Sequence, residues 1–186
     1  MKLHVCTAYA PKEIDGNLGR TYNSIMESTD ADYVAFVDHD AMFTTSDWYH
    51  QICEIIDQNK DAGLFTAVTN RIYNKQQLRP LEGHDYLKHR SYGKELQSKH
   101  RTSVEPMNST NPRTLLSGVL MVVNRKAWEE VKFREGFLGV DNSMHKDMLS
   151  KGWDVLLMTG VYLYHFYRGD NDLSHVNRFR KLTCRP

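Results

Sequence analysis

The sequence is poor in cysteine and proline, and it contains no long hydrophobic run. Its 186 residues include 3 cysteines and 5 prolines, and Cys6, Cys53 and Cys184 form no Cys-x-x-Cys pair. This pattern excludes a disulfide-rich scaffold and predicts reduced thiols, as in a cytoplasmic protein. No apolar stretch is long enough to span a membrane, and no signal-peptide pattern follows Met1. We therefore expect a cytoplasmic protein without an integral membrane segment.

The chain also lacks a substantial net charge. It carries 24 Lys and Arg against 23 Asp and Glu, a formal net charge of +1, so nothing global indicates a nucleic-acid partner or an anionic membrane surface. The length predicts a single domain over residues 1–186, large enough to bury a core without disulfides. The basic residues are unevenly distributed, however. Between Arg71 and Arg113, nine Lys and Arg stand against four Asp and Glu.

Hydrophobic periodicity predicts alternating strands and helices. Strands are expected at residues 3–8, 32–37, 64–69 and 115–123, with two late strands at 153–158 and 161–164. Helices are expected at residues 18–26, after Ser46 as N-cap, at 125–131 and at 141–151. The polar segment 71–113 is weakly periodic, with a possible helix at 85–98. This alternation predicts an α/β fold with a mostly parallel central sheet and helices on its faces.

The most informative stretch is residues 31–40, where an apolar run ends in two carboxylates separated by one residue. Tyr33–Val37 is predicted to be a buried strand, followed at once by Asp38 and Asp40. Because an unpaired buried charge is costly, the two carboxylates are best explained by a cation bound at a crevice. Ligands bind outside the carboxyl ends of strands in open α/β sheets, and oxygen ligands favour Mg²⁺, Mn²⁺ or Ca²⁺. The alternative is that one Asp caps a turn and the other is solvated.

Three further positions could carry chemistry, each with a structural alternative. His165 follows the predicted strand 161–164; it is either a structural histidine or a nitrogen ligand to the same metal, which would favour Mn²⁺ over Ca²⁺. Asp141 begins a predicted helix, as its N-cap or as a general base. Gly118 opens a predicted strand, where it either forms a tight turn or lets a ligand approach the backbone.

These segments together resemble glycosyltransferases of the GT-A fold, particularly the family 2 type, in a minimal single-domain form. The segments that carry the resemblance are 17–23, 33–43, 116–119, 137–152 and 161–165, which occur in family order. The resemblance implies a Rossmann-like GT-A fold with a mostly parallel central sheet and helices on both faces. It also implies a hexosyltransferase-type enzyme that moves a sugar from a nucleoside-diphosphate sugar to a glycan or another hydroxyl acceptor.

The resemblance further implies roles for individual residues. Those placed on the donor nucleotide are Thr7, Ala8, Tyr9, Asn17, Arg20, Asn23, Asp38, His39 and Arg168. Asp38, Asp40 and His165 would hold Mn²⁺ or Mg²⁺ on the diphosphate, and Asp141 would deprotonate the acceptor, giving inversion. UDP is the nucleotide that family frequency favours, although no residue specifies it. The basic segment 71–113 is a candidate acceptor region, and the polar tail 166–186 a candidate lid over the phosphates.

One departure from this pattern and the partial likeness to two other enzyme classes leave alternatives open. The acidic pair that such enzymes carry before the helix is Val140-Asp141 here, so a non-catalytic nucleotide-sugar-binding module is a second hypothesis. A haloacid-dehalogenase-like phosphatase also has Asp-x-Asp after a strand, but Met42 stands where a Thr or Val is usual. A sugar-nucleotide pyrophosphorylase would need a Gly-rich loop after the first strand, and this sequence has none.

Overall fold

The computed structural model describes residues 1–10, 16–81, 83 and 85–166. Arg168 and the chain from residue 167 onward, which includes nearly all of the predicted lid, lie outside the described residues. The strands are β1 (Leu3–Cys6), β2 (Tyr33–Val37), β3 (Ala41–Phe43), β4 (Ala62–Thr69), β5 (Val104–Pro106), β6 (Leu120–Asn124) and β7 (Asp154–His165). The helices are α1 (Leu18–Ser28), α2 (Trp48–Gln58), α3 (Tyr86–His100), α4 (Arg125–Glu130) and α5 (Val140–Ser150).

The strands form one curled sheet in the order β1-β2-β6-β4-β7-β3, with β5 also paired to β7. Strands β1, β2, β4 and β7 run in the same direction, as the pairing of β1 with β2 and of β4 with β7 shows. Strand β6 lies antiparallel between β2 and β4. It runs that way because the long segment between β4 and β6 returns to the end of the sheet at which β4 finishes. The mixed α/β prediction is confirmed, and the parallel prediction holds for these four strands.

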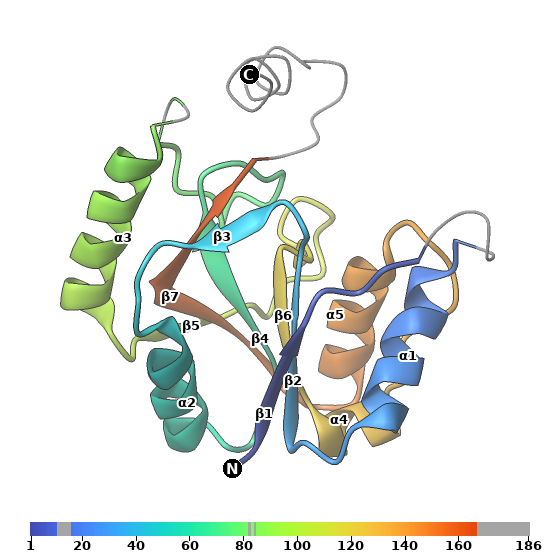
Figure 1. The fold of residues 1–186 in the computed structure, drawn as a ribbon. Coiled ribbons are helices and arrows are strands. Elements are labelled where there is room, and N and C mark those ends of the chain that lie inside the picture. Colours follow the sequence, from blue (N-terminus) through green and yellow to red (C-terminus); the bar gives the residue numbers. More distant parts are fainter. Residues whose placement is uncertain (11–15, 82, 84, 167–186) are drawn as a thin grey trace, which may run out of the picture.

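Helices cover both faces of the sheet, as expected (Figure 1). On one face, α1, α4 and α5 bury side chains that include Tyr22, Trp128 and Met148. On the other face, α2 buries Ile52, Ile55 and Ile56 at helical spacing. All residues of the central strand β4 are buried, because alternate side chains enter the two cores.

Several predicted boundaries were wrong. Strand β6 begins at Leu120, because the preceding residues 115–119 form a loop that polar side chains hold. The two predicted late strands are one strand, β7, although its pairing with β4 shifts between Met158 and Tyr162. The predicted break at Thr159-Gly160 is therefore an irregularity within that strand. The N-cap position of helix α2 is Asp47, one residue after the predicted Ser46, and its side chain makes no capping hydrogen bond.

Part of the basic segment 71–113 is regular structure that supports the sheet. It contains α3, the longest helix at 15 residues, and β5, which pairs with the middle of β7. Asp85 caps α3 by accepting a hydrogen bond from the Leu87 N–H, which confirms the helix expected there. None of the helices in the described residues is long and apolar enough to cross a membrane.

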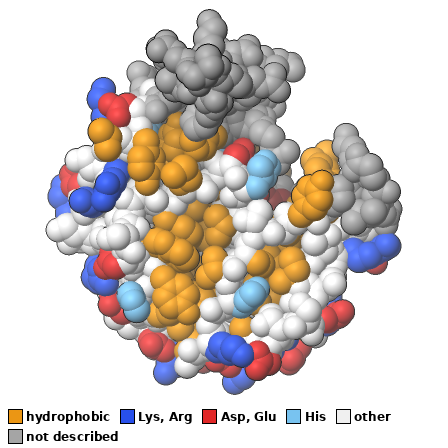
Figure 2. Space-filling model, viewed as in Figure 1, with side chains coloured by type: hydrophobic (Ala, Val, Ile, Leu, Met, Phe, Trp, Pro, Cys, Tyr) orange, Lys and Arg blue, Asp and Glu red, His pale blue; other side chains and the backbone are white. Residues whose placement is uncertain are grey.

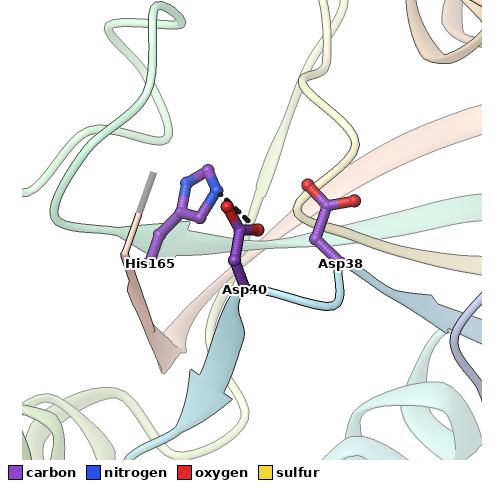
Figure 3. A group of neighbouring side chains, drawn as sticks. All are labelled: Asp38, Asp40 and His165. Carbon is purple, nitrogen blue, oxygen red and sulfur yellow. Dashed lines mark ion pairs between the residues drawn. The ribbon is translucent and has the colours of Figure 1, made fainter. Parts of the chain in front are cut away.

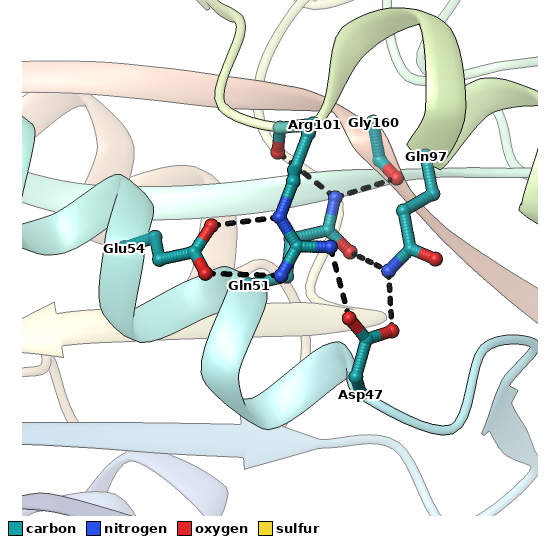
Figure 4. A network of polar contacts seen from close by, with 6 residues as sticks. All are labelled: Asp47, Gln51, Glu54, Gln97, Arg101 and Gly160. Atoms are coloured by element: carbon teal, nitrogen blue, oxygen red, sulfur yellow. Dashed lines mark hydrogen bonds and ion pairs between the residues drawn. The ribbon is translucent and has the colours of Figure 1, made fainter.

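A polar network ties α2 to the end of α3 and to β7 (Figure 4). Arg101 donates to both carboxylate oxygens of Glu54 at 2.8 and 3.0 Å and to Asp47 at 2.9 Å. Beneath it, the buried Gln51 amide donates to the carbonyls of Arg101 and Gly160, both at 2.9 Å. Through the Gly160 carbonyl the network joins α2 to the irregular part of β7.

Candidate functional site

The pairing of β3 with β7 brings Asp38, Asp40 and His165 together. The chain turns after β2, where the Ala41 N–H donates to the Asp38 carbonyl at 3.1 Å. It then enters β3, which is antiparallel to β7 with Ala41 opposite His165. Asp40, which precedes Ala41, therefore lies beside the last residue of β7. The short strand β3 was not predicted from the sequence, yet it sets the register of the site.

Three side chains converge at this point (Figure 3). Two come from the turn after β2, and the third comes from the end of β7. Asp38, Asp40 and His165 each offer one ligand atom, and these atoms lie within 4.8 Å of one another. The His165 Nε2 is 3.3 Å from the Asp40 Oδ1, and its Nδ1 is 2.8 Å from the Arg71 carbonyl oxygen. Because a carbonyl oxygen only accepts, Nδ1 carries a proton and orients the ring. Nε2 is thereby directed at the carboxylates.

The electrostatics of this cluster favour a positive charge between its members. Burial lowers the pKa of His165, but Asp40, the Arg71 carbonyl and Asp38 together outweigh burial and raise it. The two carboxylates therefore attract a proton to Nε2, and they would attract a metal cation in the same way. Two carboxylate oxygens and one imidazole nitrogen form a donor set suited to Mn²⁺ or Mg²⁺. The residues present thus fit a divalent cation.

Asp141 lies at the same end of the sheet and is attached to the loop that precedes β6. Its Oδ2 accepts the Gly118 N–H at 2.8 Å, and its Oδ1 accepts the Asn142 N–H at 2.8 Å. The Asp38 N–H donates to the Val119 carbonyl at 3.1 Å, so the same loop contacts both acidic residues. Burial raises the pKa of Asp141, although the two backbone N–H groups act in the opposite direction.

Asp141 is not the N-cap of α5, the structural alternative considered above. The N-cap is Gly139, which has a φ of 72°, and Asp141 lies in the first turn. Gly118 lies close to Asp141, because a Cβ on Gly118 would be 3.3 Å from the Asp141 Cβ. This closeness explains why position 118 is a glycine. That spacing is tighter than nearly all real Cβ contacts, so a larger residue would press on Asp141.

Sequence analysis missed four polar side chains that hold this loop. Asn74 and Gln77 come from the segment that follows β4, and Asn142 and His145 come from α5. Asn142 and His145 could have been suspected, because they lie within one helical turn of Asp141. Nothing in the local sequence distinguishes Asn74 or Gln77 from other polar residues of the basic segment.

Three residues predicted near the nucleotide have partners within the protein. Asn17 caps α1, and its Oδ1 accepts the Arg20 and Gly136 N–H groups, each at 2.9 Å. Arg20 forms an ion pair with Glu135 at 2.8 Å. Asn23 donates to the Phe133 carbonyl and accepts the indole N–H of Trp128, each at 2.9 Å. These contacts brace α1 against the segment that leads to α5, and a nucleotide contact by these residues remains a prediction.

The loop after β1 is open to solvent on this side of the molecule. Thr7 is exposed, Ala8 is half-buried and Tyr9 is 78% exposed. His39, in the turn between the two aspartates, is also exposed. These four residues are accessible to a ligand, as their predicted role requires.

A hydrophobic surface borders the Asp-Asp-His cluster. Figure 2 shows hydrophobic side chains gathered over α2, β3 and β1 on the viewed face. Half-buried hydrophobic residues next to the aspartates in the chain include Val37 and Ala41, and Phe43 stacks on Trp48 with ring centroids 3.8 Å apart.

Comparison with protein-family models identifies one match, described as "Glycosyltransferase like family", over residues 12–158. The matched region contains Asp38, Asp40, Gly118 and Asp141, and it ends before His165. A search of curated proteins found no match.

Proposed function

Because the chain belongs to this glycosyltransferase-like family, we propose that it transfers a sugar from a nucleoside-diphosphate sugar to an acceptor hydroxyl with a divalent metal. The observation that supports the metal site is the convergence of Asp38, Asp40 and His165, whose ligand atoms lie within 4.8 Å of one another. The proposal includes a Rossmann-like GT-A architecture and a single domain over residues 1–186.

The metal ligands would be the carboxylates of Asp38 and Asp40 and the Nε2 of His165. A bound Mn²⁺ or Mg²⁺ supplies positive charge to the departing nucleoside diphosphate. The protein holds the imidazole ready through the Nδ1–H bond to the Arg71 carbonyl, so that the ring need not reorient. The mixed oxygen and nitrogen donor set favours Mn²⁺.

Asp141 is the proposed general base. Its raised pKa makes the carboxylate a stronger base at neutral pH than an exposed aspartate. The hydrogen bonds from the Gly118 and Asn142 N–H groups fix the direction of the carboxylate. Asp141 would take the proton of the acceptor hydroxyl as that oxygen attacks the anomeric carbon. A single displacement of this kind inverts the anomeric configuration.

A second candidate function is nucleotide-sugar binding without transfer. Val140 stands where related enzymes carry a second carboxylate, and it is buried in the core. The site therefore has one carboxylate in the first turn of α5, where two would be expected. In this alternative the metal cluster would bind the donor, but Asp141 would not act on an acceptor.

The two functions are separated by incubation of the protein with UDP-, GDP- and dTDP-hexoses, with and without Mn²⁺, in the presence of simple glycan acceptors. We expect release of the nucleoside diphosphate from one donor class, UDP-sugars by family frequency, only when Mn²⁺ is present. Metal-dependent binding without release from any donor would support the non-catalytic alternative. Neither binding nor release would contradict both.

A further inference from the structure

The loop Leu115–Gly118, which leads into β6, is held by side chains along its whole length. Asn74 donates to the Leu115 carbonyl at 2.6 Å, and Asn142 donates to the Leu116 carbonyl at 2.8 Å. The buried Gln77 amide accepts the Ser117 N–H at 2.8 Å and donates to the Ser117 carbonyl at 3.1 Å. At the end of the loop, the Gly118 N–H donates to Asp141. The loop is thus a rigid support for the Asp141 carboxylate.

His145 joins this loop to α5 from within the core. Its side chain is fully buried, with 0% exposure. Its Nδ1 lies 2.8 Å from the Leu116 backbone nitrogen, and its Nε2 lies 2.7 Å from the Met107 carbonyl oxygen. Because an amide N–H only donates and a carbonyl only accepts, the proton must be on Nε2 and the lone pair on Nδ1. Burial lowers the pKa of His145 and so favours this neutral ring.

The position of His145 links it to Asp141 in two ways. It lies four residues after Asp141 on α5, so both side chains project from the same face of the helix. Both residues also accept hydrogen bonds from the same loop. His145 accepts the Leu116 N–H, and Asp141 accepts the Gly118 N–H two residues later. Loss of the first contact would remove one of the bonds that hold the loop beside Gly118 and would loosen the placement of the Gly118 N–H against the carboxylate.

We propose that His145 is a positioning residue for Asp141, acting through the bond from the Leu116 N–H to its Nδ1. The inference rests on the proposed function, because it takes Asp141 as the base that acts on the acceptor. The positioning matters because a displacement of about 1 Å at a reacting group can lower a rate about 100-fold. No contact of His145 with donor or acceptor is required.

Two substitutions separate positioning from packing. Asparagine places an amide oxygen near the position of Nδ1, so His145→Asn keeps an acceptor for the Leu116 N–H and loses the donor to Met107. Glutamine places its amide nitrogen near Nε2, so His145→Gln keeps the donor to Met107 and loses the acceptor. Each variant loses one buried hydrogen bond, so the two proteins should have comparable melting temperatures.

The kinetic test uses the donor that the panel above selects, beginning with UDP-glucose and Mn²⁺. For His145→Gln we expect kcat to fall about 10- to 100-fold with an unchanged donor KM, whereas His145→Asn should stay within about threefold of the parent. Equal losses of kcat in the two variants, or a parental kcat in His145→Gln, would overturn the proposal.

Hydrogen exchange and NMR test the contact without any turnover. We expect faster exchange of the Leu116 and Gly118 amides in His145→Gln than in His145→Asn, and equal rates would overturn the proposal. In the unsubstituted protein, the ¹⁵N spectrum of His145 should show an unprotonated Nδ1 and a protonated Nε2, and the opposite tautomer would overturn it. If the unsubstituted protein transfers no sugar, the proposed function fails while these spectra still decide whether the His145 contact holds the loop.

Discussion

At the residue scale, the acidic groups of the site lie in two different electrostatic environments. Asp40 faces an imidazole, whose Nε2 is 3.3 Å away. Asp141 faces two backbone N–H groups instead, and burial raises its pKa. The first environment suits a carboxylate that shares a cation, and the second suits a carboxylate that exchanges a proton. This difference is the reason for the proposed roles, in which Asp40 binds the metal and Asp141 acts as the general base.

Substitution of Asp141 tests its role as a base. In Asp141→Asn the amide oxygen can accept one of the two backbone N–H bonds, so the site should remain folded and bind the donor nearly normally. Sugar transfer should fall by about 10²- to 10⁴-fold, the usual contribution of a general base. The measurement is kcat alongside nucleotide affinity in the presence of Mn²⁺.

The matched control is Asp147→Asn, the same substitution on the same helix. Asp147 forms an ion pair with the exposed Arg134, outside the site, and its replacement should leave kcat unchanged. Parental turnover in Asp141→Asn would place the base elsewhere.

At this scale the sequence was sufficient to single out the three side chains that converge, Asp38, Asp40 and His165, and their role as metal ligands stays a prediction. Asp38 and Asp40 follow an apolar strand, and His165 ends another, so each position was suspect for a physical reason. The supporting residues could not be predicted in the same way. Asn74 and Gln77 are buried polar residues that bond to backbone groups of a distant loop, and no local sequence pattern indicates such a contact.

At the element scale, α3 packs closely against Thr44, the residue that follows β3. Gly93 of α3 is buried against Thr44, and a Cβ at Gly93 would collide with the Thr44 side chain. The Thr44 hydroxyl in turn donates to the Tyr162 carbonyl of β7 at 2.8 Å. Helix α3 thus presses on the segment that follows β3, and β3 carries the register that brings Asp40 beside His165.

The substitution Gly93→Ala tests this contact. Alanine is favoured over glycine in a helix by about 1 kcal/mol, but here overpacking should dominate and lower the free energy of unfolding by about 1–3 kcal/mol. We also expect weaker Mn²⁺-dependent nucleotide binding, because β3 must move away from α3. Urea denaturation and nucleotide titration would measure the two effects.

Ser98→Ala provides a control at an exposed position of the same helix. It should change the free energy of unfolding by no more than about 0.5 kcal/mol. A Gly93→Ala protein that is more stable than its parent would show that the contact with Thr44 does not constrain β3.

Periodicity predicted most of the elements and missed the two shortest strands. Helices α1, α2 and α5 and strands β2 and β4 were expected because their apolar spacing repeats over several residues. Strands β3 and β5 have only three residues each, too few for a period to emerge. Leu115 and Leu116 suggested an earlier start for β6 because they are apolar, and they are indeed buried, but their backbone bonds go to side chains instead of to a neighbouring strand.

At the scale of the whole molecule, the site depends on a strand order that the sequence does not specify. Asp38, Asp141 and His165 are far apart in the chain, and they lie at the same end of the sheet because β2 and β7 finish there and β6 begins there. The antiparallel insertion of β6 follows from the return path of the segment between β4 and β6. Local hydrophobic patterns carry no information on that path, so the sequence predicted the class of the fold but not the direction of β6.

The start of β4 lies at the end of the sheet opposite the site. A residue there can therefore serve as an internal control. Asp61 is exposed immediately before β4 begins, at the end of that strand remote from the cluster. Asp61→Ala therefore removes a carboxylate without altering the site, whereas Asp40→Ala removes a proposed metal ligand.

The most direct test of the metal-dependent donor site is the melting temperature of three proteins: the unsubstituted chain, Asp40→Ala and Asp61→Ala. Each is measured with UDP, GDP, CDP, dTDP and ADP, with and without Mn²⁺. We predict that one diphosphate stabilises the unsubstituted protein and Asp61→Ala only when Mn²⁺ is present, by about 2.7 kcal/mol at 100 times the dissociation constant. Asp40→Ala should fold but show no such stabilisation. Stabilisation that is independent of Mn²⁺, or equal in Asp40→Ala, would contradict the metal site, and no stabilisation by any diphosphate would contradict the proposed donor.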